Sequence, residues 1–222
     1  MVTVAVLPIK TFARAKHRLA DAVGVPDRRA LAEAMAGDVL EALAAVEGLD
    51  GVIAVTAEPA AADAARESGA TVVRDTDEAG QSAAAMIGVE AALAAGADRA
   101  LLVPGDCPAL DPGEVGRLLS HQGRAGVVIV PDRHGAGTNA LLLSPPAVIE
   151  PSFGPGSFAR HAARAHAAGT VVRVAGISSL GLDVDTPDDL RALCAVLAAR
   201  PGGAPRTREL LARMLPAAAA AG

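Results

Sequence analysis

The sequence predicts an α/β fold of one domain, with a mostly parallel central sheet and helices on both faces. Short apolar runs rich in Val, Ile and Leu alternate along the chain with longer segments of helical spacing. Such alternation indicates successive β-α-β units, whose strands are parallel and whose crossovers are right-handed. The length of 222 residues and the hydrophobic fraction of 51% suffice for one sizeable core. With three Phe and neither Trp nor Tyr, that core must consist of aliphatic side chains.

Each expected element rests on a local signal. The first strand is rich in β-branched residues and ends near Pro8, and the first long helix opens at Pro26 and keeps apolar residues at helical spacing. Thr186 and Pro187 open the last long helix as its N-cap and first residue. Strands are expected at 2–9, 51–56, 71–73, 100–103, 127–130, 140–143 and 171–174, and helices at 26–46, 60–68, 83–95, 114–120, 159–168 and from 187 on.

Composition and charge exclude several classes of function. A net charge of −5, an isoelectric point near 5.5 and the lack of a basic stripe with aromatic residues argue against a nucleic-acid binder. No segment has the length and apolarity of a membrane span or a leader. Cys107 and Cys194 form neither a disulfide framework nor a zinc site, so a cytoplasmic protein with free thiols is expected.

Three carboxylates stand out from the helix caps. Asp106 lies on the Pro104-Gly105 turn that ends the fourth predicted strand, the edge where ligands bind in open α/β sheets. Asp183 and Asp185 alternate in an extended segment, so both side chains point to one side. Together the three offer the oxygen ligands that Mg²⁺ prefers. The alternative for Asp106 is that it caps an ordinary turn.

A basic loop follows the first predicted strand. Lys10, Arg14, Lys16 and Arg18 lie within nine residues in a protein of net negative charge. A cationic cluster at the ligand-binding edge suits a polyphosphate, although a solvated surface loop would have the same composition. Neither a Walker sequence nor a GxGxxG motif is present, which argues against a Walker-type loop or a dinucleotide fold. A second polar loop, residues 75–82, could hold a base edge or be a plain connection.

Two glycine-rich segments suggest a further anion site. Thr138 and Asn139 end the first segment, where the chain re-enters a strand and glycines let the backbone approach a ligand. In the second, residues 154–157 (GPGS) open a helix, where unpaired N–H groups, the helix dipole and a hydroxyl would converge on an anion. Arg160 and His161, one turn further, could add positive charge. A bare hairpin turn, a simple N-cap and a surface histidine are the alternatives.

Five stretches, in chain order, resemble the phosphoenolpyruvate/2-phospho-L-lactate guanylyltransferases of coenzyme F-420 biosynthesis. They are LPIKTFARAKHRL, PGDCPAL, PDRHGAGTNALLL, SFGPGSFARH and GLDVDTPDDL, and the resemblance spans Val4 to about Arg200. GTNAL and SFGPGSF are specific to this family, whereas GDCP and LDVDTP are shared with a wider group of sugar-nucleotide and molybdopterin nucleotidyltransferases. The resemblance implies a Rossmann-like (GT-A-like) nucleotidyltransferase domain. It also implies transfer of GMP from GTP to the phosphate of a small phosphorylated carboxylic acid, with release of pyrophosphate.

In the predicted layout, residues 1–200 form this domain and residues 201–222 a linker and a short peripheral helix. The resemblance implies that Asp106, Asp183 and Asp185 hold Mg²⁺, with Mn²⁺ possible, and that Lys16 acts beside them as a catalytic residue. It places the triphosphate on Lys10, Lys16 and Arg18, and the acceptor acid on Thr138, Gly154 and Ser157. The loops themselves add Asp75, Gly80, Gln81, Ser82 and Gly105 to the predicted nucleotide site, and Asn139 and Gly156 to the predicted acceptor site. Because Gly80-Gln81-Ser82 is only loosely like the base-binding loop of the wider group, the choice of guanine rests on the resemblance alone.

The implied chemistry agrees with these parts. A phosphate monoester has a second pKa of about 6, so the acceptor is already a nucleophile at neutral pH and needs no general base. No Ser-His-Asp set is visible in the sequence. Catalysis would then consist of positioning and of neutralising charge on the phosphates.

Phosphoenolpyruvate is the expected acceptor, ahead of 2-phospho-L-lactate, with 3-phosphoglycerate third. The composition, rich in Ala, Gly and Arg, is typical of a high-GC bacterial gene, and relatives from such backgrounds tend to use phosphoenolpyruvate. Two other functions stay open. The small GPGSF site disfavours a molybdopterin-type nucleotidyltransferase, and three intact carboxylates disfavour a non-catalytic nucleotide-binding protein. No coiled-coil heptads are present to predict an oligomeric state.

Overall fold

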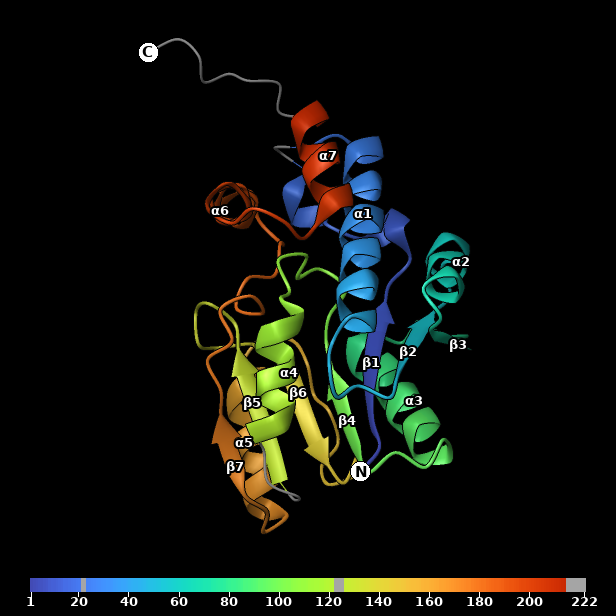
Figure 1. The fold of residues 1–222 in the computed structure, drawn as a ribbon, viewed down its shortest axis with the longest axis vertical. Coiled ribbons are helices and arrows are strands. Elements are labelled where there is room, and N and C mark those ends of the chain that lie inside the picture. The colour runs from blue at the N-terminus through green and yellow to red at the C-terminus, as the bar shows by residue number, and fades with distance from the viewer. Residues whose placement is uncertain (21–22, 122–125, 215–222) are drawn as a thin grey trace.

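One seven-stranded sheet organises the residues that the computed structural model describes, namely 1–20, 23–121 and 126–214 (Figure 1). Its strand order is β3-β2-β1-β4-β6-β5-β7. The strands are β1 (Thr3–Ile9), β2 (Gly51–Thr56), β3 (Thr71–Arg74), β4 (Arg99–Leu102), β5 (Gly126–Pro131), β6 (Thr138–Ser144) and β7 (Val172–Val174). All seven overlap the predicted strands, and β2 has the predicted bounds.

The sheet is mostly parallel, as predicted. β6 pairs antiparallel with both β4 and β5, whereas the remaining pairs, β1–β2, β1–β4, β2–β3 and β5–β7, are parallel. The reversal follows from the short connection between β5 and β6, because a parallel return needs a crossover of a dozen residues or more. The β5–β6 pair is therefore a hairpin, with a register shift at Val130 and Pro131.

Helices cover both faces of the sheet. They are α1 (Val25–Ala44), α2 (Pro59–Glu67), α3 (Gln81–Ala94), α4 (Pro112–His121), α5 (Ser157–Ala167), α6 (Pro187–Ala199) and α7 (Pro205–Met214), with short 3₁₀ turns η1 (Phe12–Arg14) and η2 (His17–Leu19). Ala5 and Leu7 of β1 pack in one cluster with α1, α2 and α4, and Val4 and Val6 pack in another with α3 and α5. Because β1 is buried on both faces, it reads as a continuous apolar run.

The last two helices form a third cluster with the N-terminal half of α1. Leu193 of α6 and Leu211 of α7 share this cluster with Leu31 and Met35. In Figure 1, α7 lies beside α1, beyond the carboxyl end of β1. Residues 215–222, part of the predicted C-terminal segment, lie outside the described residues. None of the helices described is both long and apolar enough to cross a membrane.

Four elements begin two residues earlier than their predicted ranges: α3 at Gln81, α4 at Pro112, α5 at Ser157 and β6 at Thr138. Helices α3 and α5 start directly after glycines, because Gly80 (φ 110°) and Gly156 (φ 71°) hold N-cap positions with positive φ. Gln81 and Ser82 therefore belong to a helical turn and not to the preceding loop.

Candidate active site

A pocket of about 240 Å³ opens at the carboxyl ends of β1 and β4, next to the start of α3. The basic loop after β1, the turn after β4 and the loop before α3 form its walls. Of the residues predicted to bind nucleotide or metal, Lys10, Lys16, Asp75, Gly80, Gln81, Gly105, Asp106 and Asp185 line it. Arg18, Ser82 and Asp183 do not, and Arg18 is exposed on η2. The basic and acidic segments meet here because parallel strands bring their carboxyl ends to one edge.

Lys16 lies between two carboxylates of this pocket. Its Nζ is 2.5 Å from Asp106 Oδ2 and 3.1 Å from Asp185 Oδ1, and its side chain is only 5% exposed. Burial acts to lower the pKa of Lys16, but the attraction of Asp106 and Asp185 outweighs it and the pKa is raised. The ammonium therefore stays charged at neutral pH and is held in place by two counter-charges.

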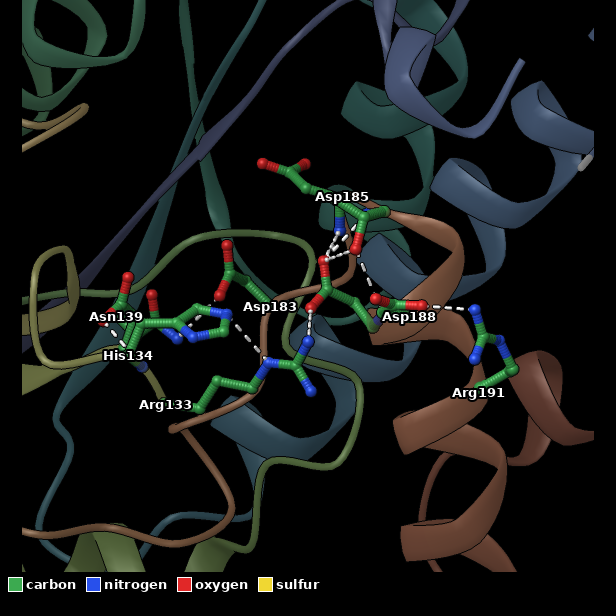
Figure 2. Close-up of polar contacts among 10 residues, drawn as sticks. Arg133, His134, Asn139, Asp183, Asp185, Asp188 and Arg191 are labelled. Carbon is green, nitrogen blue, oxygen red and sulfur yellow. Dashed lines mark hydrogen bonds and ion pairs between the residues drawn. The ribbon is translucent and has the colours of Figure 1, made fainter. Parts of the chain in front are cut away.

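The negative charge of Asp106 acts on Asp183. Burial and the charge of Asp106 raise the pKa of Asp183 above its usual range. Asn139 Nδ2 donates to Asp183 Oδ1 at 3.2 Å (Figure 2) and to the carbonyl oxygen of Leu180 at 2.8 Å. The backbone N–H of Val184 donates to the Asp106 carbonyl at 3.2 Å, which ties the segment carrying Asp183 and Asp185 to the turn after β4.

Asp106, Asp183 and Asp185 are the residues of this site whose chemistry could hold a hard divalent cation. Asp106 Oδ1 is buried without a hydrogen-bond partner, and such an atom is costly unless a ligand satisfies it. Carboxylate oxygens are the ligands that Mg²⁺ takes. Among the described residues, no three side chains of metal-ligating type converge on one point, and the Lys16 ammonium stands between Asp106 and Asp185.

Sequence reasoning missed Glu58, which fastens the basic loop. Its Oε2 accepts the buried N–H of Phe12 at 3.0 Å, and its Oε1 is 3.6 Å from Arg29 Nη2. Glu58 lies two residues after the end of β2 and holds the N-cap position of α2, without a capping hydrogen bond from its side chain. Its signal in the sequence is the one used for Asp106, an acid placed where a buried strand ends and a helix begins.

The predicted acceptor residues lie outside the pocket lining but belong to the same edge. Thr138 and Asn139 are buried at the start of β6, and Ser157 is buried at the start of α5. The backbone N–H of Phe153 donates to Ser82 Oγ at 2.9 Å. The loop before α5 is thus attached to the first turn of α3, where Gln81 lines the pocket.

Two expectations about the start of α5 are wrong. The N–H groups of Ser157 and Phe158 are not free, because they donate to the carbonyl oxygens of Gly154 (3.0 Å) and Ala136 (3.2 Å). His161 is neither on the surface nor a source of charge. It is 0% exposed, and burial together with Arg160 and Arg164 lowers its pKa to about 4. The N–H groups and the His161 ring are all hydrogen-bonded by neighbouring segments that pack over this end of the helix.

A capping box orders the chain next to Asp185. Thr186 caps α6, accepting the backbone N–H of Asp189 at 3.2 Å, while the Asp189 side chain accepts the N–H of Thr186 at 2.7 Å. The helix start predicted at Thr186 and Pro187 is therefore confirmed. Arg133, on the β5–β6 connection, adds an ion pair to Asp189 at 2.5 Å. The acidic segment is thus held from two sides.

Comparison with known proteins gives this geometry a family. The model of the family "Guanylyl transferase CofC like" matches residues 3–210. The chain belongs to this guanylyltransferase family. It is 50% identical over 217 residues to the phosphoenolpyruvate guanylyltransferase of Conexibacter woesei, with 97% of each chain covered. It is 38% identical to the enzyme of the same name from Sphaerobacter thermophilus, covering 87% of this chain and 93% of that one.

Solved structures show the same fold for this guanylyltransferase family member at low sequence identity. A nucleotidyl transferase from Methanothermobacter thermautotroptrophicus superimposes with a TM-score of 0.63 at 22% identity, covering 90% of this chain and 99% of the other. The nucleotidyltransferase fold predicted from the sequence is therefore confirmed.

Proposed function

We propose that this protein transfers GMP from GTP to the phosphate of phosphoenolpyruvate and releases pyrophosphate. The observation that carries the proposal is the buried Lys16 ammonium, bracketed by Asp106 and Asp185 in a pocket at the carboxyl edge of the sheet. A charged group held in this way suits a triphosphate, whose negative charge must be offset where the α-phosphate reacts. The names of the relatives support guanine as the base and phosphoenolpyruvate as the acceptor.

In the proposed reaction, an oxygen of the acceptor phosphate forms a bond to the α-phosphorus of GTP. The bond from that phosphorus to the oxygen bridging the β-phosphate breaks, and pyrophosphate leaves with the electron pair. Lys10 and Lys16 offset the charge of the triphosphate, while Asp75, Gly80 and Gln81 form the wall against which the nucleoside lies. The product is enolpyruvyl-diphospho-guanosine.

Asp106, Asp183 and Asp185 would hold Mg²⁺ or Mn²⁺, with the orphaned Asp106 Oδ1 as the best-supported ligand atom. When bound, the cation would supply charge neutralisation at the phosphates. We place the reaction in coenzyme F-420 biosynthesis, as the resemblance implies. The free thiols of Cys107 and Cys194 favour the cytoplasm.

The test is to incubate the protein with GTP and Mg²⁺ and, separately, phosphoenolpyruvate, 2-phospho-L-lactate or 3-phosphoglycerate. The GMP adduct is measured by mass and pyrophosphate by a coupled assay. We expect the fastest turnover with phosphoenolpyruvate. Turnover with 2-phospho-L-lactate alone would overturn the choice of acceptor and leave GMP transfer standing. The absence of any adduct with all three acids would overturn the proposed function.

A further inference from the structure

We propose that Arg160 and His161 of α5 are positioning residues for the acceptor acid, an inference that rests on the proposed function. His161 orients the hydroxyl of Thr138 so that it donates a hydrogen bond to the anionic acceptor. Arg160 shapes the loop of residues 152–156 and brings a positive charge to it. The argument starts from the hydrogen bonds of the His161 ring.

The hydrogen bonds of His161 determine which ring nitrogen carries the proton. Nε2 lies 2.8 Å from the backbone N–H of Ser152, and Nδ1 lies 3.0 Å from Thr138 Oγ1. A backbone N–H can only donate, so Nε2 must accept and carries no proton. The neutral ring then has its proton on Nδ1, which donates to Thr138. Burial, Arg160 and Arg164 keep the ring neutral by lowering its pKa to about 4.

This tautomer settles what the Thr138 hydroxyl can do. Its oxygen accepts the Nδ1–H of His161, so its own proton stays available. The opposite tautomer would take that proton for His161 and leave the hydroxyl as an acceptor. Among the described residues, no other side chain takes the Thr138 proton. Phosphate and ionised carboxylate oxygens are acceptors only, so Thr138 matches an anion. Its neighbour Asn139 contacts Asp183, so the backbone that carries the hydroxyl adjoins the segment of Asp183 and Asp185.

Arg160 holds the loop before α5 through its main-chain oxygens. Nη2 donates to the carbonyl oxygens of Ser152 (3.1 Å) and Phe153 (3.2 Å), Nη1 donates to that of Pro155, and Nε donates to Ser152 Oγ (3.1 Å). Carbonyl groups orient a guanidinium without cancelling its charge. No carboxylate among the described residues pairs with Arg160. The loop therefore has a permanent positive charge beside it, which favours an anion there.

The loop of residues 152–156 is also attached to the wall of the nucleotide pocket. Phe153 donates its N–H to Ser82 Oγ at 2.9 Å, in the same helical turn as Gln81 of the pocket wall. The Phe153 ring meets the His161 ring edge to face, with centroids 5.3 Å apart. Arg160 and His161, at the start of α5, thus position both the loop and the Thr138 hydroxyl relative to the nucleotide pocket.

The test compares two variants of His161, each of which can keep one of the two hydrogen bonds of the ring. In His161→Asn the amide can still donate toward Thr138, as Nδ1 does, whereas in His161→Gln the longer side chain can accept from Ser152 but no longer donates to Thr138. We expect His161→Gln to raise the KM for phosphoenolpyruvate by about tenfold or more. The Thr138 hydroxyl is then no longer oriented by a donor on residue 161, and its proton is free to turn away from the acceptor. His161→Asn should raise it less. In both, the KM for GTP should change less than about twofold, because the nucleotide pocket is separate.

Arg160→Gln should also raise the KM for phosphoenolpyruvate and leave that for GTP unchanged. Its control is Arg66→Gln on α2, an exposed arginine that pairs with Asp63 at 2.8 Å, and it should leave both KM values unchanged. Thermal unfolding of each variant is measured alongside.

The outcomes separate this inference from the proposed function. If wild-type protein forms no GMP adduct with any acid, the proposed function fails and the inference falls with it. If adduct forms but His161→Gln keeps the wild-type KM for phosphoenolpyruvate, the inference alone is overturned. A parallel rise in both KM values, or equal effects of Arg160→Gln and Arg66→Gln, would also overturn it, because a general loss of structure would then explain the data.

Discussion

The charge balance at Lys16 decides how the pocket receives a triphosphate. Lys16→Ala leaves Asp106 and Asp185 without the cation that lies 2.5 and 3.1 Å from them, so the pocket becomes strongly negative. We expect the KM for GTP to rise, or kcat to fall, by at least about tenfold. Arg18→Ala is the control on the same loop, and its effect should be smaller because the exposed Arg18 does not line the pocket. Equal effects of the two changes would contradict a specific role for Lys16 and would show that only the total charge of the loop matters.

Asp106 is the residue on which the cation proposal depends most. Asp106→Asn keeps the shape of the side chain but removes its charge, and Oδ1 is the buried atom without a partner. We expect pyrophosphate release to fall by at least about a hundredfold, and release by wild-type protein to stop when EDTA removes Mg²⁺. Calorimetric titration with Mn²⁺ should show weaker binding to the variant. Near wild-type release or unchanged Mn²⁺ affinity would contradict the assignment.

At the scale of elements, the contact between α3 and β1 depends on one glycine. A Cβ added at Gly88 would lie 2.1 Å from Val6 Cγ1 and 3.2 Å from Val55 Cγ2, and Val6 is fully buried. Helix propensity alone would make Gly88→Ala stabilising by about 1 kcal/mol. The clash outweighs this, and we expect the free energy of unfolding to fall by about 1–3 kcal/mol in a urea titration.

The matched control for Gly88→Ala removes the other side of the clash. Val6→Ala destabilises by creating a cavity, but in the Gly88→Ala background the new methyl group fills part of that space. The double variant should therefore be more stable than the sum of the two single losses predicts. If the two losses in the free energy of unfolding simply add, the methyl group introduced by Gly88→Ala does not clash with Val6.

At the scale of the whole molecule, Asp38 joins the C-terminal helix to the domain. Its buried carboxylate accepts the first backbone N–H groups of α7, from Arg206 at 3.1 Å and Thr207 at 2.8 Å. We expect Asp38→Ala to lower the free energy of unfolding by about 2 kcal/mol and the Tm by several degrees. Glu41→Ala is the control, since exposed Glu41 also pairs with Arg206 (2.6 Å) and should change stability little. Equal losses would show that the ion pair, and not the cap, anchors α7.

The class of fold and the position of the site follow from the sequence alone. Hydrophobic periodicity and the residues that end strands are local, and parallel strands bring their carboxyl ends to one edge whatever the details of packing. Lys10, Asp106 and Gln81 could therefore be assigned to one site from their places after strands or before a helix, and the pocket contains all three.

Contacts between distant segments decided the rest. Lys16 meets Asp185 across 169 positions of sequence, and no periodicity predicts that pair. His161 looked like a surface residue, yet it is buried because the loop at Ser152 and the start of β6 both close on it. The N–H of Phe158 is bound by Ala136 from another connection. The physical reason is the same in each case. A local sequence pattern determines on which element and at which edge a residue lies. Packing determines which distant polar group forms its hydrogen bonds, and therefore whether it is charged and where it carries its proton.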